Sequence, residues 1–458
     1  MGIRASLNET GKPTGKPTGK PTGKPAAQSN LRMVRLGVDV PLFLALFTLV
    51  VFGLLILYSA SWDFSRAVRE DSDPYYIFNR QLLWLVVGLL GAFTAAWFKY
   101  KYFIKLAAWG MALTLIALAI VLVIGETRLG ATRSLFGGSF QPSELAKVAV
   151  VVYLAVWLNA KKERLDEVGF GLFPMGIILG IVSGLIAAQP DMSAVFTIVV
   201  LGGMMFFLAG GKLKQMLIVL MLTAVVGFAI VKFTETGRAR IEGFIIGVQD
   251  AKEADYHVQR SLEAFVEGSW FGKGLGQADT KHTGLPVPST DSIYAVIGEE
   301  TGVIGATFVL SLYSLILWRG LQIARRAPDL LGALLAGGLT VWVAMEAFIN
   351  MAVILNLLPF AGNALPFISS GGSSLVTSLI AMGIVMNVSR TGEREAQEAG
   401  VHMSEVVDFQ KRRDNRPPRW TPEPAKSKPL ADFTPNTIDR RMAVRDPKAR
   451  RAKRSTRE

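Results

Sequence analysis

Ten stretches of mostly apolar residues, each about 20 residues long, recur along this chain. A helix of that length crosses the hydrocarbon core of a bilayer. Backbone N–H and C=O groups cannot stay unpaired in lipid, so a crossing segment is either a helix or a strand of a closed barrel. No segment alternates apolar and polar residues with the period of two that a membrane barrel requires. The sequence therefore predicts an all-α polytopic membrane protein.

The distribution of basic residues predicts the orientation of the spans. "KYKYFIK" (99–105) and "KKER" (161–164) follow even-numbered spans, whereas the connections 189–192 and 358–366 contain no Lys or Arg. The positive-inside rule then places both termini in the cytoplasm and a large extracytoplasmic loop, 234–292, between spans 7 and 8. The ten predicted spans are 38–60, 81–98, 102–125, 145–159, 170–188, 193–209, 213–233, 293–318, 331–357 and 367–388.

The formal net charge of +13 belongs to the two tails that flank the membrane domain, 38–389. Residues 1–37 carry +6 and contain the repeat "GKPTGKPTGKPTGKP", and residues 390–458 carry +7. Both tails are predicted to be mostly disordered, because neither offers an apolar core. Basic tails are typical of the cytoplasmic face of an anionic membrane, so we expect no nucleic-acid partner. The chain has no cysteine, which excludes disulfides and thiolate chemistry.

The stretch "LPVPSTDSIYAVIGEETGVIG" (285–305) places three acids at the start of predicted span 8. Asp291 suits either a helix N-cap or a functional carboxylate. Glu299 and Glu300 lie about 12–14 Å further along a helix, and acids within a membrane are candidates for function. A structural ion pair, or a protonated acid with a hydrogen-bond partner, is the alternative for both glutamates.

Two further polar elements begin spans on the same outer side. "FQPSELAK" (140–147) places Glu144 and Lys147 on one helix face, where Lys147 either extends outward to water or faces an acid inside. "QPDMS" (189–193) contains Gln189 and Asp191, and a helix N-cap is the favoured role for Asp191.

The fourth outer element is "NLLPFAGNALPFISSGGSSL" (356–375), which prolines and glycines break. Irregular backbone at membrane depth is tolerated where it lines a cavity or is buried in protein. Its hydroxyls and free N–H groups suit phosphate or sugar oxygens, although a tight turn between packed helices is equally open. The serines concerned are Ser369, Ser370, Ser373 and Ser374. Four polar elements on one side predict an outward-facing, acid-lined cavity.

These motifs resemble, in order, the signatures of the SEDS family (shape, elongation, division and sporulation) of FtsW/RodA-like proteins. The motifs are "GATRSLFGGSFQPSELAK", "AAQPD", "GKGLGQ", "LPVPSTDSIYAVIGEETGVIG" and "LPFISSGGSSL". "GGSSL" and the long tails favour the FtsW branch. The chain departs from the family pattern at Ser292, Ser370, Arg260 and Ala361, and the stretch before Gln141 looks shortened.

The resemblance implies a peptidoglycan glycosyltransferase of the bacterial cytoplasmic membrane. It would polymerise lipid II on the outer face, beside a class B penicillin-binding protein, with other division or elongation proteins recruited through the tails. Asp291 would be the base in a single inverting displacement, since the leaving diphosphate is α-linked and the product linkage is β-1,4.

The resemblance also places Glu144 and Lys147 in the catalytic set. Lys147, Arg133, Lys273 or a divalent cation, Mg²⁺ or Mn²⁺, would neutralise the diphosphate. Glu299 and Glu300 would position cations and water. Two alternatives remain at this stage: a lipid II flippase, and a non-catalytic scaffold that recruits division proteins.

Overall fold

The structure is a computed structural model, and the chain divides into two units, Met1–Gly400 and Val401–Glu458. Of the second unit only helical residues, 401–414, are described. The described residues are 38–68, 74–128, 131–134, 140–165, 167, 169, 171–215, 217–219, 221, 227, 235–359 and 361–414.

Nine of the ten predicted spans coincide with helices in the described part of the chain. Seven of these helices are long and apolar enough to cross a bilayer, and α5 and α6 are shorter. Predicted span 213–233 falls mostly outside the described residues. The prediction of an all-α polytopic membrane protein is confirmed. The helices are α1 (Val40–Val68), α2 (Tyr76–Trp97), α3 (Phe103–Ile124), α4 (Pro142–Lys161), α5 (Leu172–Ala187), α6 (Met192–Leu208), α10 (Ile293–Arg325), α11 (Leu330–Ile354) and α12 (Gly372–Asp414).

Three features differ from the predicted segments. A short antiparallel pair, β1 (Glu126–Arg128) and β2 (Ala131–Ser134), follows α3. The predicted loop 234–292 contains α8 (Glu235–Gln249) and α9 (Tyr256–Gly268). The C-tail, predicted to be disordered from residue 390, is helical to Asp414, because "EREAQEA" is rich in helix formers and contains no breaker.

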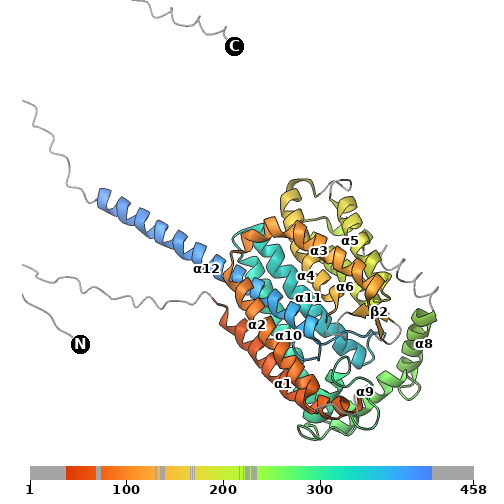
Figure 1. The fold of residues 1–458 in the computed structure, drawn as a ribbon. Coiled ribbons are helices and arrows are strands. Elements are labelled where there is room, and N and C mark those ends of the chain that lie inside the picture. The colour runs from red at the N-terminus through yellow and green to blue at the C-terminus, as the bar shows by residue number, and fades with distance from the viewer. Residues whose placement is uncertain are drawn as a thin grey trace, which may run out of the picture. The chain divides into compact units, whose positions relative to one another are not determined.

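Contacts at both ends of α1 and α10 fix these two helices as antiparallel neighbours (Figure 1). At one end the Arg319 guanidinium pairs with Asp39 before α1. At the other end the Ser59 hydroxyl near the end of α1 donates to the Glu300 carboxylate near the start of α10. Helix α11 packs on α10 and is the most buried of the long spans.

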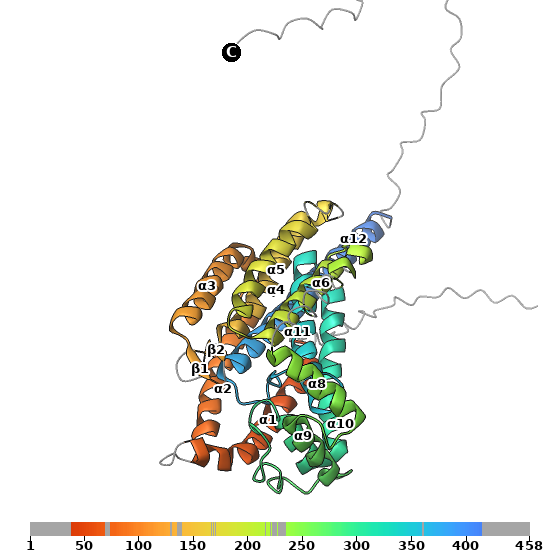
Figure 2. The same cartoon turned by 90° about the vertical axis from the view of Figure 1, so that its right-hand side faces the viewer.

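Helix α10 is broken near its start by Gly302, whose φ of 69° and ψ of −174° are not helical. A positive φ is tolerated by glycine, which lacks a Cβ. The segment after α9 satisfies the backbone groups that the break leaves open: Lys273 N donates to Glu299 O at 2.9 Å, and Val303 N donates to Ser269 O at 3.0 Å. Figures 1 and 2 both place α9 at the end of the helices where α10 begins.

The break separates Glu299 and Glu300 from the rest of α10. The apolar run after Gly302, 303–318, is about 24 Å long at 1.5 Å per residue. The buried turns before Gly302 contact the segment that follows α9. The expectation that both glutamates belong to one continuous helical span is therefore wrong.

We expect Gly302→Ala to lower the apparent melting temperature of the purified protein. A Cβ at this position would lie 2.5 Å from the nitrogen of Gly272. The positive φ alone costs a non-glycine residue about 1–2 kcal/mol. A thermal unfolding scan in detergent measures the shift. Gly176→Ala is the matched control, because a Cβ there meets nothing within 4 Å. Equal melting temperatures for Gly302→Ala and wild type would contradict the account of the break.

Candidate active site

The structure joins the four outer elements that the sequence singled out. Gln141, in the element 140–147, contacts two of the others: its amide Nε2 donates to Asp191 Oδ2 at 3.1 Å and its backbone N donates to Ser373 Oγ at 3.2 Å. The broken segment before α12 then meets the start of α10: Ser370 N donates to the Ser289 carbonyl at 2.8 Å. The Ser369 hydroxyl donates to the Thr290 carbonyl at 2.7 Å.

Asp291 lies half-buried in this junction, two residues before α10. The N-cap of α10 is Ser292, so the alternative of Asp291 as the cap is wrong. The carboxylate lies against the backbone of Gly362, where an added Cβ would be 2.8 Å from Asp291 Oδ2. Asn350 Nδ2 of α11 donates to the Asp291 carbonyl at 2.9 Å and to the Asn363 carbonyl at 2.6 Å. One amide therefore ties the Asp291 segment to the broken segment.

Lys147 is 4 % exposed and faces inward. Of the two predicted directions, outward to water or inward to an acid, the structure has the second. Its ammonium contacts Glu144 Oε1 at 2.8 Å on the same helix face and also contacts Glu346 Oε1 of α11. Two carboxylates and one ammonium give this buried triad a formal charge of −1. Lys147 is thus already neutralised within the chain.

Sequence reasoning missed Glu346 and Asn350. The signal was present, because Glu346 is the single acid in the predicted span 331–357, and an acid within a membrane span is a functional candidate. Asn350 follows one helical turn later, on the same face. Both side chains are nearly inaccessible to solvent, at 3 % and 2 % exposure.

Glu299 and Glu300 each have partners in the segment after α9. Glu299 accepts from Lys273 Nζ at 3.0 Å and from the Asp279 backbone N at 2.7 Å. Glu300 accepts from Lys281 Nζ at 3.2 Å and from Ser59. These contacts are the structural ion pairs that the sequence left open as an alternative, and they hold the outer segment to α1 and α10.

One group of acids in the described residues has oxygens close enough for a metal ion: Glu267, Asp279 and Glu299. Lys273 Nζ contacts all three carboxylates. Hydrogen bonds to Glu267 and then to Asp279 raise the pKa of the Lys273 ammonium, and the hydrogen bond from Lys273 lowers the pKa of the Asp279 carboxyl. The ammonium already fills the role that a cation would have there, so this group does not fit a metal.

The remaining predicted residues have identifiable places. Asp191 is the N-cap of α6, and its side chain accepts a hydrogen bond from Ala194 N, which is the role that the sequence favoured. Gln189 is buried and donates to the Leu118 carbonyl, and Ser374 is buried in the first turn of α12. Arg133 belongs to β2, and its side chain lies outside the described residues.

We expect Asp191→Ala to reduce stability rather than chemistry. Loss of an N-cap costs about 1 kcal/mol, and the hydroxyl of Ser143, which donates to Asp191 Oδ2 at 3.0 Å, would lose its acceptor as well. The apparent melting temperature should fall, while the reaction rate per folded molecule stays within about twofold of wild type. A rate loss comparable to that of Asp291→Asn would contradict the capping role.

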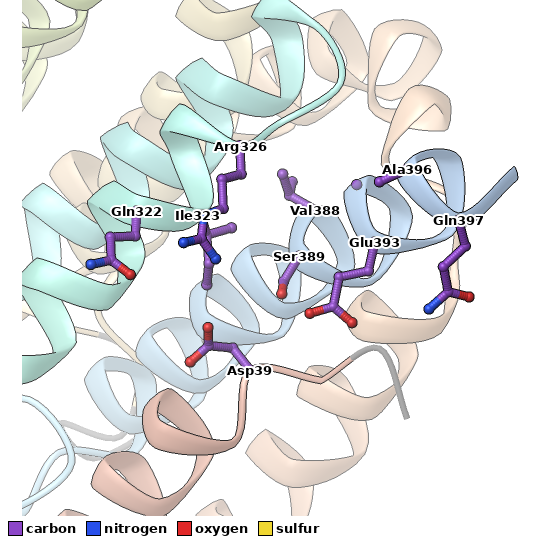
Figure 3. A pocket seen from close by; sticks show the side chains of 10 residues that line it. Asp39, Gln322, Ile323, Arg326, Val388, Ser389, Glu393, Ala396 and Gln397 are labelled. Carbon is purple, nitrogen blue, oxygen red and sulfur yellow. The ribbon is translucent and has the colours of Figure 1, made fainter. Parts of the chain in front are cut away.

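A separate pocket of about 400 Å³ lies at the other end of α10 (Figure 3). Asp39, Gln322 and Arg326 line it together with Ser389 and Glu393 of α12. Arg326 follows the last residue of α10, whereas Asp291 precedes the first. This pocket is therefore not the acid-lined outer cavity that the sequence predicted.

The helices and the polar junction at one end of them define a multi-pass membrane protein. A family model described as "Cell cycle protein", FtsW/RodA/SpoVE, matches residues 40–394. The chain belongs to this family. The predicted resemblance is confirmed over the whole membrane domain.

Curated relatives agree with this assignment. The "Probable peptidoglycan glycosyltransferase FtsW" of Geobacter sp. (strain M18) is 37 % identical over 358 residues, which cover 77 % of this chain and 97 % of the relative. "Stage V sporulation protein E" of Bacillus subtilis (strain 168) is 34 % identical over 361 residues, with 77 % and 97 % covered.

Solved structures show the same fold. A chain from work on "Structural coordination of polymerization and crosslinking by a peptidoglycan synthase complex" is 25 % identical, with a TM-score of 0.64 and coverage of 78 % of this chain and 99 % of that chain. The rod shape determining protein RodA of Thermus thermophilus is 25 % identical, with a TM-score of 0.57 and coverage of 78 % and 98 %.

Proposed function

We propose that the chain is a peptidoglycan glycosyltransferase that polymerises lipid II into glycan strands at the outer face of the bacterial cytoplasmic membrane. The names of its relatives support the activity. The observation that carries the proposal is the junction around Asp291, where one amide of Asn350 ties the Asp291 segment to the broken segment that contains Gly362 and Asn363.

Asp291 is the proposed general base. An inverting displacement needs one carboxylate to take the proton from the acceptor hydroxyl as the glycosidic bond forms and the diphosphate leaves. The Asp291 carboxylate is half-buried and follows an irregular segment, and the cap of α10 is Ser292, which supports a role for Asp291 in chemistry rather than in capping. Glu299 and Glu300 then stabilise the outer segment beside the site rather than contact substrate.

The diphosphate needs positive charge, and the two lysines that the sequence offered for it are already paired with acids. Lys147 is shared by two carboxylates and Lys273 by three. We therefore reassign Lys147 from the diphosphate to the organisation of the site. Arg133 would supply the countercharge to the leaving group, as would a divalent cation, Mg²⁺ or Mn²⁺, where one is bound. The serines before and at the start of α12 lie beside the same junction.

The proposal includes a partner and an orientation. One structural neighbour comes from a peptidoglycan synthase complex that coordinates polymerisation with cross-linking, which supports a class B penicillin-binding protein as the partner of this chain. The basic residues after even-numbered spans support cytoplasmic termini and an extracytoplasmic site.

The test is a polymerisation assay with the full chain, its candidate penicillin-binding partner, labelled lipid II and Mg²⁺ or Mn²⁺. Glycan strands resolved on a gel, and lost when the chain is omitted, are the expected result. No strands from a folded complex in either metal would overturn the proposal. Movement of intact lipid II across a vesicle bilayer under the same conditions would instead support a flippase.

A further inference from the structure

We propose that Glu346 and Asn350, one helical turn apart on α11, are positioning residues that couple the buried Lys147 triad to the Asp291 segment. This inference rests on the proposed function, because its kinetic consequence concerns the polymerisation of lipid II. Neither residue is assigned a direct contact with substrate.

The first contact joins α4 to α11. Lys147 could pair with Glu144 alone, since the two lie three residues apart on one helix. The ammonium also contacts Glu346 and lies 5.9 Å from the centre of the Trp342 ring, which precedes Glu346 by one turn on α11. The second carboxylate thus fixes the position of α11 relative to α4.

The second contact joins α11 to the proposed base. Asn350 Nδ2 donates to two backbone carbonyls, those of Asp291 and Asn363, which belong to segments far apart in the sequence. Two hydrogen bonds from one buried amide set the separation of these segments, and the Asp291 carboxylate lies against Gly362 between them. A shift of α11 would therefore move the base relative to the backbone it faces.

The charge of the triad indicates that Glu346 is present for geometry rather than for charge balance. Glu144 alone would neutralise Lys147, so charge balance does not require Glu346, and an ionised Glu346 would add an unbalanced buried charge, which is unfavourable. A glutamine at this position would keep an oxygen acceptor for the ammonium and remove the excess charge. A leucine would remove the acceptor at similar volume.

The experiment compares Glu346→Gln, Glu346→Leu, Asn350→Leu and the double variant with wild type, using the full chain with its partner and labelled lipid II. We expect Glu346→Gln to keep kcat within about threefold, because the acceptor remains. We expect Glu346→Leu and Asn350→Leu to lower kcat by about 10- to 100-fold, with KM for lipid II within about twofold, because misplacement by about 1 Å costs up to about 100-fold. The double variant should be no slower than Asn350→Leu, since both act on one segment.

Amide hydrogen exchange of residues 285–292 gives a readout that does not need activity. Exchange should accelerate in both leucine variants and stay at the wild-type rate in Thr340→Val. Thr340 is the matched control, because it is a buried polar residue of α11 whose hydroxyl has no hydrogen-bond partner among the described residues.

The outcomes separate the two proposals. Faster exchange without strands from wild type would contradict the proposed function and leave the coupling supported. Wild-type kcat and exchange in both leucine variants would overturn the inference, as would a loss in Glu346→Gln equal to that in Glu346→Leu. Should Glu346→Leu fail to fold, Asn350→Leu and Glu346→Gln still decide: an Asn350→Leu variant with wild-type kcat overturns the coupling.

Discussion

Asp291→Asn should lower the rate of glycan-strand formation by about 100- to 10,000-fold, the contribution of a positioned general base. Asparagine keeps the shape of the side chain but cannot accept the proton of the acceptor hydroxyl. The start of α10 and the link to α11 should be unaffected, because Ser292 is the N-cap of α10 and because Asn350 bonds the backbone carbonyl of residue 291 rather than its side chain. The measurement is the initial rate of polymerisation of labelled lipid II, with the melting temperature recorded in parallel.

Asp250→Asn is the matched control, since it makes the same substitution at an exposed position directly after α8. It should polymerise at the wild-type rate. A folded Asp291→Asn variant that also does so would remove Asp291 as the base and return the choice to the other acids of the junction. A variant that neither polymerises nor melts cooperatively would show that the carboxylate is structural.

The sequence predicted the fold class and the positions of nine helices because burial in lipid imposes long apolar runs. It also predicted that the elements around Gln141, Asp191, Asp291 and Ser369 share one side, which their hydrogen bonds now join directly. The prediction came from the charge of the connecting loops, because basic residues mark the cytoplasmic side and these elements lie on the opposite side.

The contacts of individual acids could not be predicted in the same way. The hydropathy of "GEETGVIG" places Glu299 and Glu300 deep in a continuous helix, because a glycine with positive φ does not interrupt an apolar pattern. Lys147 had two candidate directions, and its second partner, Glu346, lies 199 residues away in the chain. Long-range pairing depends on the packing of α4 against α11, which no local pattern encodes.

Lys147→Met should destabilise the protein by about 3–5 kcal/mol, the typical cost of removing one partner from a buried ion pair. Methionine has a similar length and fits the space, but it leaves Glu144 and Glu346 buried without a cation. A single oxygen of Glu144, Oε2, already lacks a hydrogen-bond partner among the described residues, so the site offers little compensation. The apparent melting temperature and the midpoint of unfolding in denaturant measure the loss.

Neutralising the two acids separates charge from packing in the same experiment. The triple variant Glu144→Gln/Lys147→Met/Glu346→Gln removes all three charges at nearly constant volume. It should recover most of the stability that Lys147→Met loses, because no unpaired charge remains in the interior. The triple variant should polymerise lipid II more slowly than wild type. The ammonium that links α4 to α11 is absent in it, so Asn350 no longer has a fixed position relative to α4. Recovery of stability together with the wild-type rate would show that the triad is dispensable to the chemistry. A Lys147→Met protein as stable as wild type would contradict the prediction and show that the ion pairs of Lys147 add no net stability.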